Sequence, residues 1–328
     1  MTHSIKHETM TSRISLMIMV MMTYCASSKL FAQEKDLSKI LWSANWSTDN
    51  SYFAVGGVDR NIRIFSGHTL ELLKIIQNKS AVQRMSWHPY RNILAVAATE
   101  DGSRLIDLEK DTVIHLKGLN TNGTRAIDWN YNGELIALAD YEGIITLWNQ
   151  KGELLLNITK ENTKGNVAID WHPFKNEFVV LSDSVRMYDS DGKLLRKFGH
   201  RKENVLMLCV QWHKSGDFFV IGDYGDYEYG YKALLQFWKA DGTLLKVSDI
   251  SKAEYRNIAW NKKGSRLATA SDALRIWNKK GKLLATGFSE HNLWGIDWSP
   301  NGKYIVTSDF EGQIRIWDKK ARLVRQLE

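Results

Sequence analysis

The chain has 328 residues, with 44 lysines and arginines against 37 aspartates and glutamates, which gives a formal charge of +7. The basic residues are scattered along the chain, whereas nucleic-acid-binding proteins usually gather them on one face, so we expect no nucleic-acid partner. Only three prolines occur beside 23 glycines, and no Pro- or Ser-rich stretch divides the chain. This composition favours one domain of many short strands with tight turns and disfavours disorder.

The first 32 residues have the pattern of a secretory signal peptide. Arg13 precedes a short apolar run over residues 14–22, and small and polar residues then lead to Ala32. The run is about half of the roughly 20 residues that a membrane-spanning helix needs. We therefore expect cleavage near Ala32, a short segment over residues 33–39, and an exported mature chain, periplasmic or secreted, without a transmembrane segment. Translation from Met10 would give the peptide a compact basic start.

The two cysteines bear on anchoring and on disulfides. A lipoprotein signal places a cysteine after small residues, but bulky Tyr24 precedes Cys25, so a lipid anchor at Cys25 is the minor alternative for localisation. Cys209 lies in the apolar stretch 206–210, which is typical of a small buried hydrophobic residue. With one cysteine left after cleavage, the mature chain can form no internal disulfide, and cysteine usage neither supports nor opposes export.

Seven tryptophans recur at nearly constant spacing through the rest of the chain. They are Trp46, Trp87, Trp129, Trp171, Trp212, Trp260 and Trp298, at intervals of 41, 42, 42, 41, 48 and 38 residues. A second aromatic or apolar position keeps the same period at Phe65, Ile106, Trp148, Tyr188, Trp238, Trp277 and Trp317. A period of about 40–45 residues is typical of a β-propeller blade of four short strands. The repeat therefore predicts an all-β fold with seven blades.

Each repeat divides into four expected strands, named a to d from the central channel of the predicted propeller outward. In the sixth repeat these are Tyr255–Trp260, Arg266–Ser271, Ala273–Asn278 and Lys282–Thr286. Dipeptides such as Asn301-Gly302 mark the a–b turns, and dipeptides such as Asp191-Gly192 mark the c–d turns. Strand b is continuously apolar, as in residues 94–98, which is typical of a strand buried on both faces between neighbouring blades.

These residues resemble the WD40 family. Arg275-Ile276-Trp277-Asn278 and Arg315-Ile316-Trp317-Asp318 match the closing Trp-Asp of its repeat, and Trp298-Ser299-Pro300-Asn301-Gly302 matches the end of its first strand. The resemblance implies a seven-bladed propeller of four-stranded antiparallel blades over residues 40–328. It also implies that partners bind the face that carries the b–c and d–a loops, which we call the top face.

The WD40 family often ties each blade with a hydrogen-bonded set: a histidine before strand a, a Ser or Thr in strand b, an aspartate in the b–c turn and the strand-c tryptophan. Here the set is incomplete, because only His200 and His291 precede a strand a in the expected way. The b–c turns hold Asp59, Asp183 and Asp272, with Glu142 and Glu311 in the corresponding positions of their blades. We therefore expect stability to come chiefly from Trp and aliphatic packing.

The ring is expected to close without exchanging a strand between its ends. Blade 1 fits residues 40–76 and blade 7 fits residues 293–327, so side-chain packing would join them. Pairing of Leu37–Leu41 with blade 7 is the alternative.

The sequence contains no constellation with catalytic spacing: no Gly-rich phosphate loop, no His-Glu-x-x-His and no Gly-x-Ser-x-Gly. His88 and His172 are each followed by proline at the same blade position, which favours a role in the turn over a metal pair. Asp128, Asp170 and Asp297 each precede a strand-a tryptophan, and their repetition favours blade-to-blade hydrogen bonds over a carboxylate cluster. We therefore predict no catalytic residue, no cofactor and no metal.

One segment breaks the repeat. The 48-residue interval from Trp212 to Trp260 carries extra residues between strands b and c of blade 5, over Asp223–Lys232. Its tyrosines and acids supply rigid aromatic area and hydrogen-bonding groups, which are typical of a recognition surface. The candidate partner-binding residues are Tyr224, Asp226, Tyr227, Glu228, Tyr229 and Tyr231. A solvated hairpin extension is the plainer interpretation, and cation binding by the carboxylates is a third.

A second candidate surface lies at the start of strand a, four residues before each tryptophan. These positions hold Trp42, Gln83, Arg125, Val167, Leu208, Arg256 and Trp294. Arg and Trp are frequent in binding hot spots, so Arg125, Arg256, Trp42 and Trp294 are predicted to form a partner-binding ring near the channel mouth. Alternatively, Trp42 and Trp294 fill the seam between blades 1 and 7.

The leading functional hypothesis is a non-catalytic, monomeric scaffold that binds an unidentified protein or peptide through its top face. The alternative is a propeller that binds a small ligand, or acts as an enzyme, in its central channel. A nucleic-acid-binding or translation-related WD40 protein is a third hypothesis, which the signal-peptide pattern contradicts. Fold alone does not decide among these hypotheses.

Overall fold

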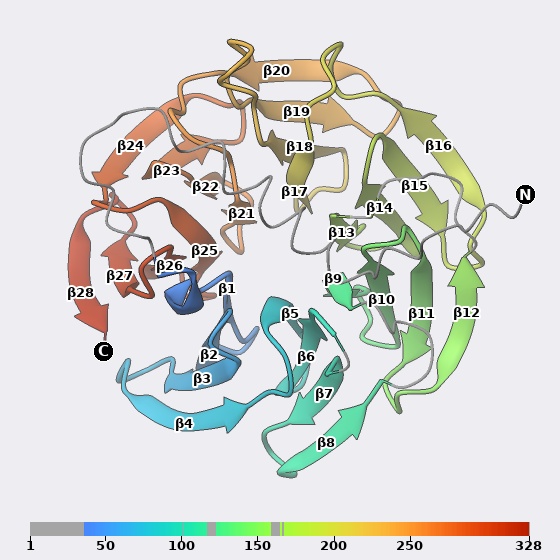
Figure 1. Ribbon diagram of the computed structural model, residues 1–328, viewed down its shortest axis with the longest axis vertical. Coiled ribbons are helices and arrows are strands. Elements are labelled where there is room, and N and C mark those ends of the chain that lie inside the picture. Colours follow the sequence, from blue (N-terminus) through green and yellow to red (C-terminus); the bar gives the residue numbers. More distant parts are fainter. Residues whose placement is uncertain (1–35, 101, 117–122, 159–164, 166, 328) are drawn as a thin grey trace, which may run out of the picture.

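The computed structural model describes residues 36–100, 102–116, 123–158, 165 and 167–327. In this part of the chain, strands β1–β28 form seven four-stranded sheets, arranged as blades around one axis (Figure 1). Within each sheet, consecutive strands pair antiparallel, as in β1–β2, β2–β3 and β3–β4. The seven-bladed architecture expected from the tryptophan spacing is confirmed. The predicted signal peptide over residues 1–32 lies outside the described residues.

The blades follow one another along the chain, each with strands a to d in order. Blade 1 holds β1 (Ser43–Trp46), β2 (Tyr52–Gly56), β3 (Asn61–Ser66) and β4 (Leu72–Gln77). Blade 2 holds β5 (Val82–Trp87), β6 (Ile93–Ala98), β7 (Arg104–Asp107) and β8 (Thr112–His115). Blade 3 holds β9 (Thr124–Trp129), β10 (Leu135–Asp140), β11 (Ile145–Asn149) and β12 (Leu154–Ile158). Blade 4 holds β13 (Ala168–Trp171), β14 (Glu177–Leu181), β15 (Val185–Asp189) and β16 (Leu194–Phe198).

The remaining three blades complete the ring. Blade 5 holds β17 (Met207–Trp212), β18 (Phe218–Asp223), β19 (Leu235–Lys239) and β20 (Leu244–Ser248). Blade 6 holds β21 (Asn257–Trp260), β22 (Arg266–Ala270), β23 (Ala273–Asn278) and β24 (Leu283–Phe288). Blade 7 holds β25 (Leu293–Trp298), β26 (Tyr304–Asp309), β27 (Ile314–Asp318) and β28 (Leu323–Leu327).

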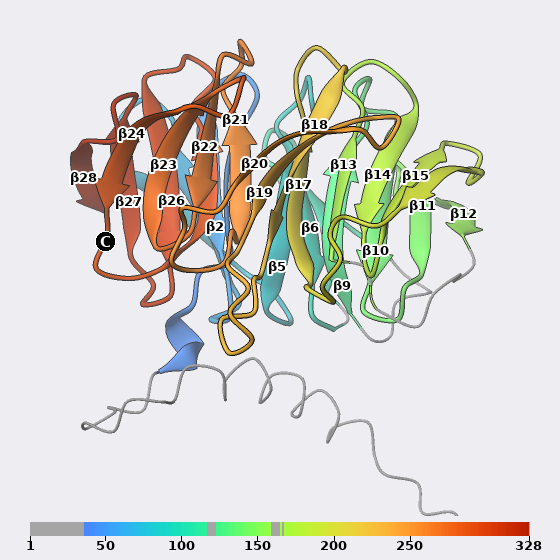
Figure 2. The same ribbon diagram turned by 90° about the horizontal axis from the view of Figure 1, so that it is seen from above.

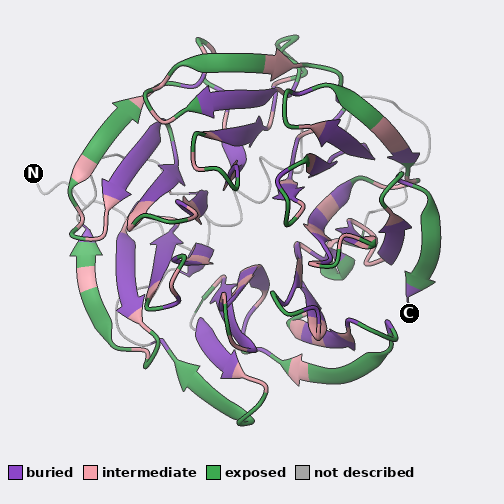
Figure 3. Ribbon diagram, turned by 180° about the vertical axis from the view of Figure 1, so that it is seen from behind, coloured by how far each residue is buried: buried purple, intermediate pink, exposed green. Residues whose placement is uncertain are grey.

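Burial falls from the inner strands to the outermost strand of each blade (Figure 3). Every residue of β6 is buried, whereas every residue of β8 is exposed. Apolar clusters join adjacent blades, as where Val179 and Met187 of blade 4 pack with Phe219 of blade 5. All seven strand-a tryptophans and all seven strand-c residues that keep the same period are buried. The repeating positions therefore form the contacts between blades.

The strand boundaries of blade 6 show how closely the sequence pattern predicts each element. Strand β23 coincides with the expected Ala273–Asn278, and β24 extends two residues past the expected end at Thr286. Strand β21 begins at Asn257 instead of Tyr255, because the Tyr255 N–H donates to the Asp223 carbonyl of the neighbouring blade at 3.1 Å. With Tyr255 bonded to the neighbouring blade, the strand begins two residues later than the local pattern predicts.

The ring closes without strand exchange, as expected, because β1–β4 and β25–β28 form separate sheets. Blades 1 and 7 share one apolar cluster, in which Leu41 is a member together with Ile316. The Leu41 N–H donates to the Asp309 carbonyl at 3.1 Å, and the Ser308 hydroxyl donates to the Leu41 carbonyl at 2.8 Å. Leu37–Lys39 forms a short 3-10 helix, η1. The alternative of pairing between Leu37–Leu41 and blade 7 therefore holds only for Leu41, because Leu37–Lys39 is helical.

Three histidines in the a–b turns, His88, His172 and His213, join neighbouring blades. The His213 ring packs edge-on against Trp260 of the next blade at 4.7 Å between centroids, and its Nε2 lies 2.8 Å from the Gly264 carbonyl oxygen. His88 and His172 accept backbone N–H groups of their own turns through Nδ1. The turn role predicted for His88 and His172 is confirmed. Burial lowers the pKa of all three imidazoles, and that of His88 to about 4.

In four blades, strand c carries a buried arginine two residues before the repeated aromatic or apolar position: Arg104, Arg186, Arg275 and Arg315. Arg275 bonds the b–c turn carboxylate of Asp272 at 2.7 Å. In blade 7, Arg315 pairs at 2.5 Å with Asp309, which takes the position assigned from the sequence to Glu311. In blade 3, the Asp140 carboxylate likewise accepts the N–H groups of the b–c turn, in place of Glu142. Buried ion pairs therefore hold the blades in addition to the expected packing.

Candidate functional site

The blade-5 insertion and the starts of strand a lie on the same face of the ring. The β18–β19 connection projects beyond the sheets on the side where η1 lies (Figure 2). On this side, the Tyr224 N–H in the b–c loop donates to the Leu206 carbonyl in the d–a connection at 2.9 Å. This face corresponds to the top face defined from the sequence.

The insertion is a short β-hairpin. Asp226 and Tyr231 pair as an isolated antiparallel bridge, with N–H···O distances of 2.6 and 2.7 Å, and the four residues between them form the tip. Tyr227, Tyr229 and Tyr231 are 44%, 71% and 39% exposed, and Glu228 is exposed beside them. The hairpin therefore presents its aromatic and acidic side chains together on the top face.

Buried hydrogen bonds fix the base of the hairpin. Asp223 is fully buried, and its carboxylate accepts from Arg201 at 3.0 Å and from the Leu234 N–H at 2.7 Å. The Tyr227 hydroxyl donates to the Ser251 carbonyl at 3.2 Å, and burial raises the pKa of this phenol. A loop already held in one orientation loses less conformational entropy when a partner binds.

Next to the hairpin, Arg256 lies between aromatic rings at the channel mouth. Its guanidinium carbon is 3.8 Å from the centre of the Trp294 ring and 5.5 Å from the centre of the Tyr224 ring. Trp42 and Trp294 stack at 6.5 Å between centroids, with 25° between their planes. Arg256 also pairs with Glu254 at 2.6 Å. We call Tyr224, Arg256, Trp294 and Trp42 the mouth stack.

The structure agrees with both interpretations of Trp42 and Trp294, as residues at the channel mouth and as residues that fill the seam between blades 1 and 7. Trp42 precedes β1 and Trp294 belongs to β25, so their stacking closes the seam between blades 1 and 7. Both side chains remain partly exposed. They therefore border the mouth while also filling the seam.

Arg125 is separate from the mouth stack. Its guanidinium lies 5.6 Å from the centre of the Tyr141 ring, so the predicted residues do not form one continuous aromatic and cationic ring. In blades 2, 3, 5 and 7 the register shifts at the fourth residue before the tryptophan, which is Gln83, Arg125, Leu208 and Trp294 respectively. Because a β-bulge lets a side chain leave the pleat, it explains how Arg125 and Trp294 stay partly exposed within buried strands.

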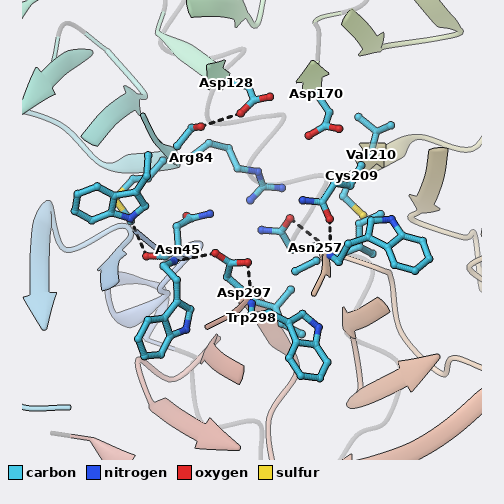
Figure 4. A pocket seen from close by; sticks show the side chains of 18 of the residues that line it. Asn45, Arg84, Asp128, Asp170, Cys209, Val210, Asn257, Asp297 and Trp298 are labelled. Atoms are coloured by element: carbon cyan, nitrogen blue, oxygen red, sulfur yellow. Dashed lines mark hydrogen bonds between the residues drawn. The ribbon is translucent and has the colours of Figure 1, made fainter. Parts of the chain in front are cut away.

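Arg84 also belongs to this region, and sequence reasoning missed it. It lines the channel (Figure 4), and its guanidinium donates to the Trp42 carbonyl at 3.3 Å and to the Arg256 carbonyl at 3.1 Å. Burial lowers the pKa of Arg84 to about 10, with contributions from the charges of Arg125 and Arg256. The only signal in the sequence that could have identified Arg84 was its charge within an otherwise regular strand a. The tryptophan repeat does not distinguish this position.

A cavity of about 450 Å³ occupies the channel (Figure 4). The residue before the strand-a tryptophan lines it in all seven blades: Asn45, Ser86, Asp128, Asp170, Gln211, Ala259 and Asp297. Lys214 and Pro300 of the a–b turns line it as well. The cavity therefore extends toward the face opposite the hairpin.

The three carboxylates in this cavity hold neighbouring blades together. Asp128 accepts the N–H of Trp171 at 3.0 Å, and Asp170 accepts that of Trp212 at 2.6 Å. Asp297 accepts the Trp46 N–H at 2.8 Å, which links blade 7 to blade 1. The predicted blade-to-blade role is confirmed. Burial raises the pKa of Asp128 to about 6 and that of Asp297 to about 7, and it raises the pKa of Asp170 well above the ordinary value.

Two kinds of feature are absent from the described part of the chain. No group of three or more His, Cys, Asp or Glu side chains there is arranged to hold a metal ion. No helix in the same residues is long and apolar enough to cross a membrane.

Two family models match parts of the chain. Residues 33–66 and 281–318 match the WD domain, G-beta repeat, in blade 1 and from the end of blade 6 into blade 7. Residues 156–287 match the model for the eukaryotic translation initiation factor eIF2A, across blades 4 to 6. No curated protein matches the chain. The matched repeats and the observed sheets together define a seven-bladed β-propeller with WD40 repeats.

Proposed function

We propose that this propeller is a non-catalytic scaffold that binds a protein or peptide partner through its top face, outside the cytoplasm. The observation that carries the proposal is the anchored hairpin of blade 5, the longest departure from the repeat. It holds Tyr227, Tyr229 and Tyr231 exposed on the same face as the mouth stack. Tyr, Trp and Arg are enriched among the few residues that dominate the binding energy of protein interfaces.

The form of this surface favours a macromolecular partner over a small ligand. The hairpin projects from the face (Figure 2), and Tyr224 at its base contacts Arg256 of the mouth stack, so a partner that contacts both must cover a broad area. Specific protein interfaces bury about 800 Å² on each partner, whereas small ligands are held in enclosed pockets. WD40 propellers commonly serve as protein-interaction scaffolds, and the matched repeats agree with that role.

The channel alternative has less support from the arrangement of polar groups. In the cavity, Asp128 accepts hydrogen bonds on both carboxylate oxygens, from Ser86 and from the Trp171 N–H. Asp297 also accepts on both oxygens, from the Trp46 and Trp298 N–H groups. These groups are already used to join blades, which leaves them less free to bind a substrate.

Affinity capture from the native source tests the scaffold role. The test protein carries Asn-Gly in place of residues 227–230, because a two-residue turn can connect Asp226 and Tyr231, which already pair across an antiparallel bridge. Shortening an exposed loop changes closure entropy little, so the fold should be kept, as judged by circular dichroism and melting temperature. Partner binding should fall by about tenfold or more, equivalent to roughly 1.4 kcal/mol.

Single substitutions provide a matched control. Tyr229→Ala removes a ring that is 71% exposed at the hairpin tip, and Tyr90→Ala removes one that is 72% exposed in an a–b turn, on the opposite face. Tyr229→Ala should weaken partner binding, and Tyr90→Ala should leave it unchanged. Equal effects from the two substitutions, or full binding after the tip is replaced, would contradict the proposal.

The proposed location depends on the signal-peptide pattern in the first 32 residues. N-terminal sequencing of protein from the native host should find a mature chain that begins near Gln33. An intact Met1 or Met10 would rule out cleavage, and a lipid-modified Cys25 would favour the membrane-anchored alternative.

The match to the translation initiation factor model favours a second candidate, a role in translation. The match spans three blades, and this segment excludes Trp42, Arg125 and Trp294. Sedimentation of the native protein with ribosomes distinguishes the two candidates. Co-sedimentation that survives the replacement of residues 227–230 would support the translation role over the scaffold proposal.

A further inference from the structure

Three arginines belong to the region where the mouth stack meets the channel: Arg84 of β5, Arg125 of the adjacent strand β9, and Arg256 of the mouth stack. Arg84 donates to the main-chain carbonyl of Arg256, across a separation of 172 residues in sequence, and to that of Trp42. The charges of Arg125 and Arg256 are close enough to lower the pKa of Arg84. Ring closure therefore brings together like charges that repel one another in a partly buried space.

These positive charges are only partly compensated in the described residues. Glu254 pairs with Arg256 at 2.6 Å. Neither Arg84 nor Arg125 forms an ion pair within the described ranges. Arg84 donates to two main-chain carbonyls, and Arg125 lies over the Tyr141 ring. An arginine has five N–H donors and no acceptor, so the two bonds made by Arg84 leave further donors available.

The nearby carboxylates are committed elsewhere. Asp223 binds Arg201, and Asp272 binds Arg275. The channel carboxylates accept tryptophan N–H groups nearer the opposite face. An anion from outside the chain would therefore relieve the repulsion among the arginines, and guanidinium groups bind carboxylate and phosphate in a planar, bidentate manner.

We infer that the channel mouth is an anion-binding site, with Arg84 and Arg125 as its main determinants, and that it receives the carboxylate or phosphate groups of an acidic segment of the partner. The inference rests on the proposed function, because it assigns the partner's chemistry at the same face. An extended segment suits the site, since acidic side chains can enter the mouth while its flanking residues lie along Trp42, Trp294 and the hairpin.

Fluorescence anisotropy with two labelled probes tests this assignment. One probe is octaglutamate, and the other is an octapeptide of alternating glycine and phosphoserine. Octalysine serves as the control probe. At about 0.15 M salt the Debye length is roughly 8 Å, so scattered surface charges contribute little. Both acidic probes should bind saturably, and octalysine should not; the tighter acidic probe tells whether the site prefers carboxylate or phosphate.

The variants separate the mouth from the general positive charge of the protein. Arg84→Gln and Arg125→Gln should each weaken binding of the preferred probe at least tenfold, whereas Arg325→Gln, in the exposed strand β28, should change it less than twofold. The contact of the Arg125 guanidinium is with the Tyr141 ring, and none of its hydrogen bonds reaches the main chain of a described residue, so Arg125→Gln remains informative if Arg84→Gln fails to fold. Arg84→Lys should bind with intermediate affinity, because it keeps the charge and loses the planar fork.

Two results would overturn the inference. One is the absence of saturable binding by either acidic probe, and the other is an equal effect of Arg125→Gln and Arg325→Gln. If the native partner is captured through the hairpin while neither probe binds, only the anion site fails. If the probes bind as expected but replacing residues 227–230 leaves partner capture unchanged, the hairpin-based scaffold proposal fails and the anion site stands.

Discussion

Asp297→Asn tests whether the buried carboxylates of the channel control the pH dependence of stability. The Asp297 carboxylate accepts the Trp46 N–H at 2.8 Å and links the first and last blades. Asparagine keeps an oxygen that can accept this bond, and it removes the titratable proton. Its amide nitrogen cannot accept the Trp298 N–H that the second carboxylate oxygen accepts, but this loss is the same at every pH. The substitution therefore isolates the charge at position 297 from the hydrogen bond that closes the ring.

The magnitude follows from the shift in pKa. Burial raises the pKa of Asp297 from 3.8 to about 7. The folded state thus binds the proton more tightly than the unfolded state, so this group adds stability fully below about pH 4 and loses it as the pH rises through 7. One pKa unit corresponds to about 1.4 kcal/mol, so about 2.7 kcal/mol would be lost between pH 5 and pH 8. Because the channel is open to water, we expect screening to reduce this to about 1–2 kcal/mol.

The assay is urea or thermal unfolding of both proteins at pH 5, 6, 7 and 8. The wild type should lose about 1–2 kcal/mol more than Asp297→Asn between pH 5 and pH 8, or roughly 2–4 °C in melting temperature. His88, His172 and His213 contribute in the opposite direction, because burial lowers their pKa, but they are the same in both proteins and cancel. Exposed Asp191→Asn is the control and should behave as the wild type. If Asp297→Asn keeps the wild-type slope, burial does not govern the ionisation of this group.

Two further predictions concern the packing of blades 5 and 6. Gly264→Ala should destabilise the ring by more than about 1 kcal/mol in denaturant unfolding. The residue has φ +65°, and an added Cβ would lie 2.7 Å from His213 Nε2. Gly230 has φ +79° and open space around it, so Gly230→Ala introduces the same backbone strain without the clash and should lower the free energy of unfolding less. Burial raises the pKa of Cys209 to about 12, so iodoacetamide at pH 8 should alkylate this thiol only when urea unfolds the chain. Peptide mass spectrometry detects the alkylation. Rapid labelling of the native protein would show instead that blade 5 opens locally.

The sequence predicted the repeating framework because the apolar pattern within each strand indicates how far that strand is buried. The period of the tryptophans gave the number of blades, and the apolar run at residues 94–98 marks β6, which is buried throughout. The repeated Asp-Trp pairs also indicated the blade-to-blade hydrogen bonds that the structure contains. A repeat constrains each blade in the same way, so local patterns were sufficient for this level of structure.

The hairpin was identified as a candidate surface because it interrupts the period, but its anchoring was not predicted. The Tyr227 hydroxyl reaches the Ser251 carbonyl, and Asp223 reaches Arg201. Ser251 and Arg201 belong to the d–a connections on either side of blade 5. A local sequence pattern does not predict which distant residue a loop side chain contacts. Only the packed ring shows that part of this tyrosine's role is structural.

Arg84 shows most clearly what only the tertiary structure decided. Its partners belong to blades 1 and 6, and the contact with Arg256 spans 172 residues of sequence. Side chains from different blades meet in the channel only when the ring closes, and the β-bulges at the start of strand a change the direction of individual residues there. The sequence determined which residues repeat and are buried, whereas closure of the ring determined which unrepeated charges face one another, because those distances depend on all seven blades at once.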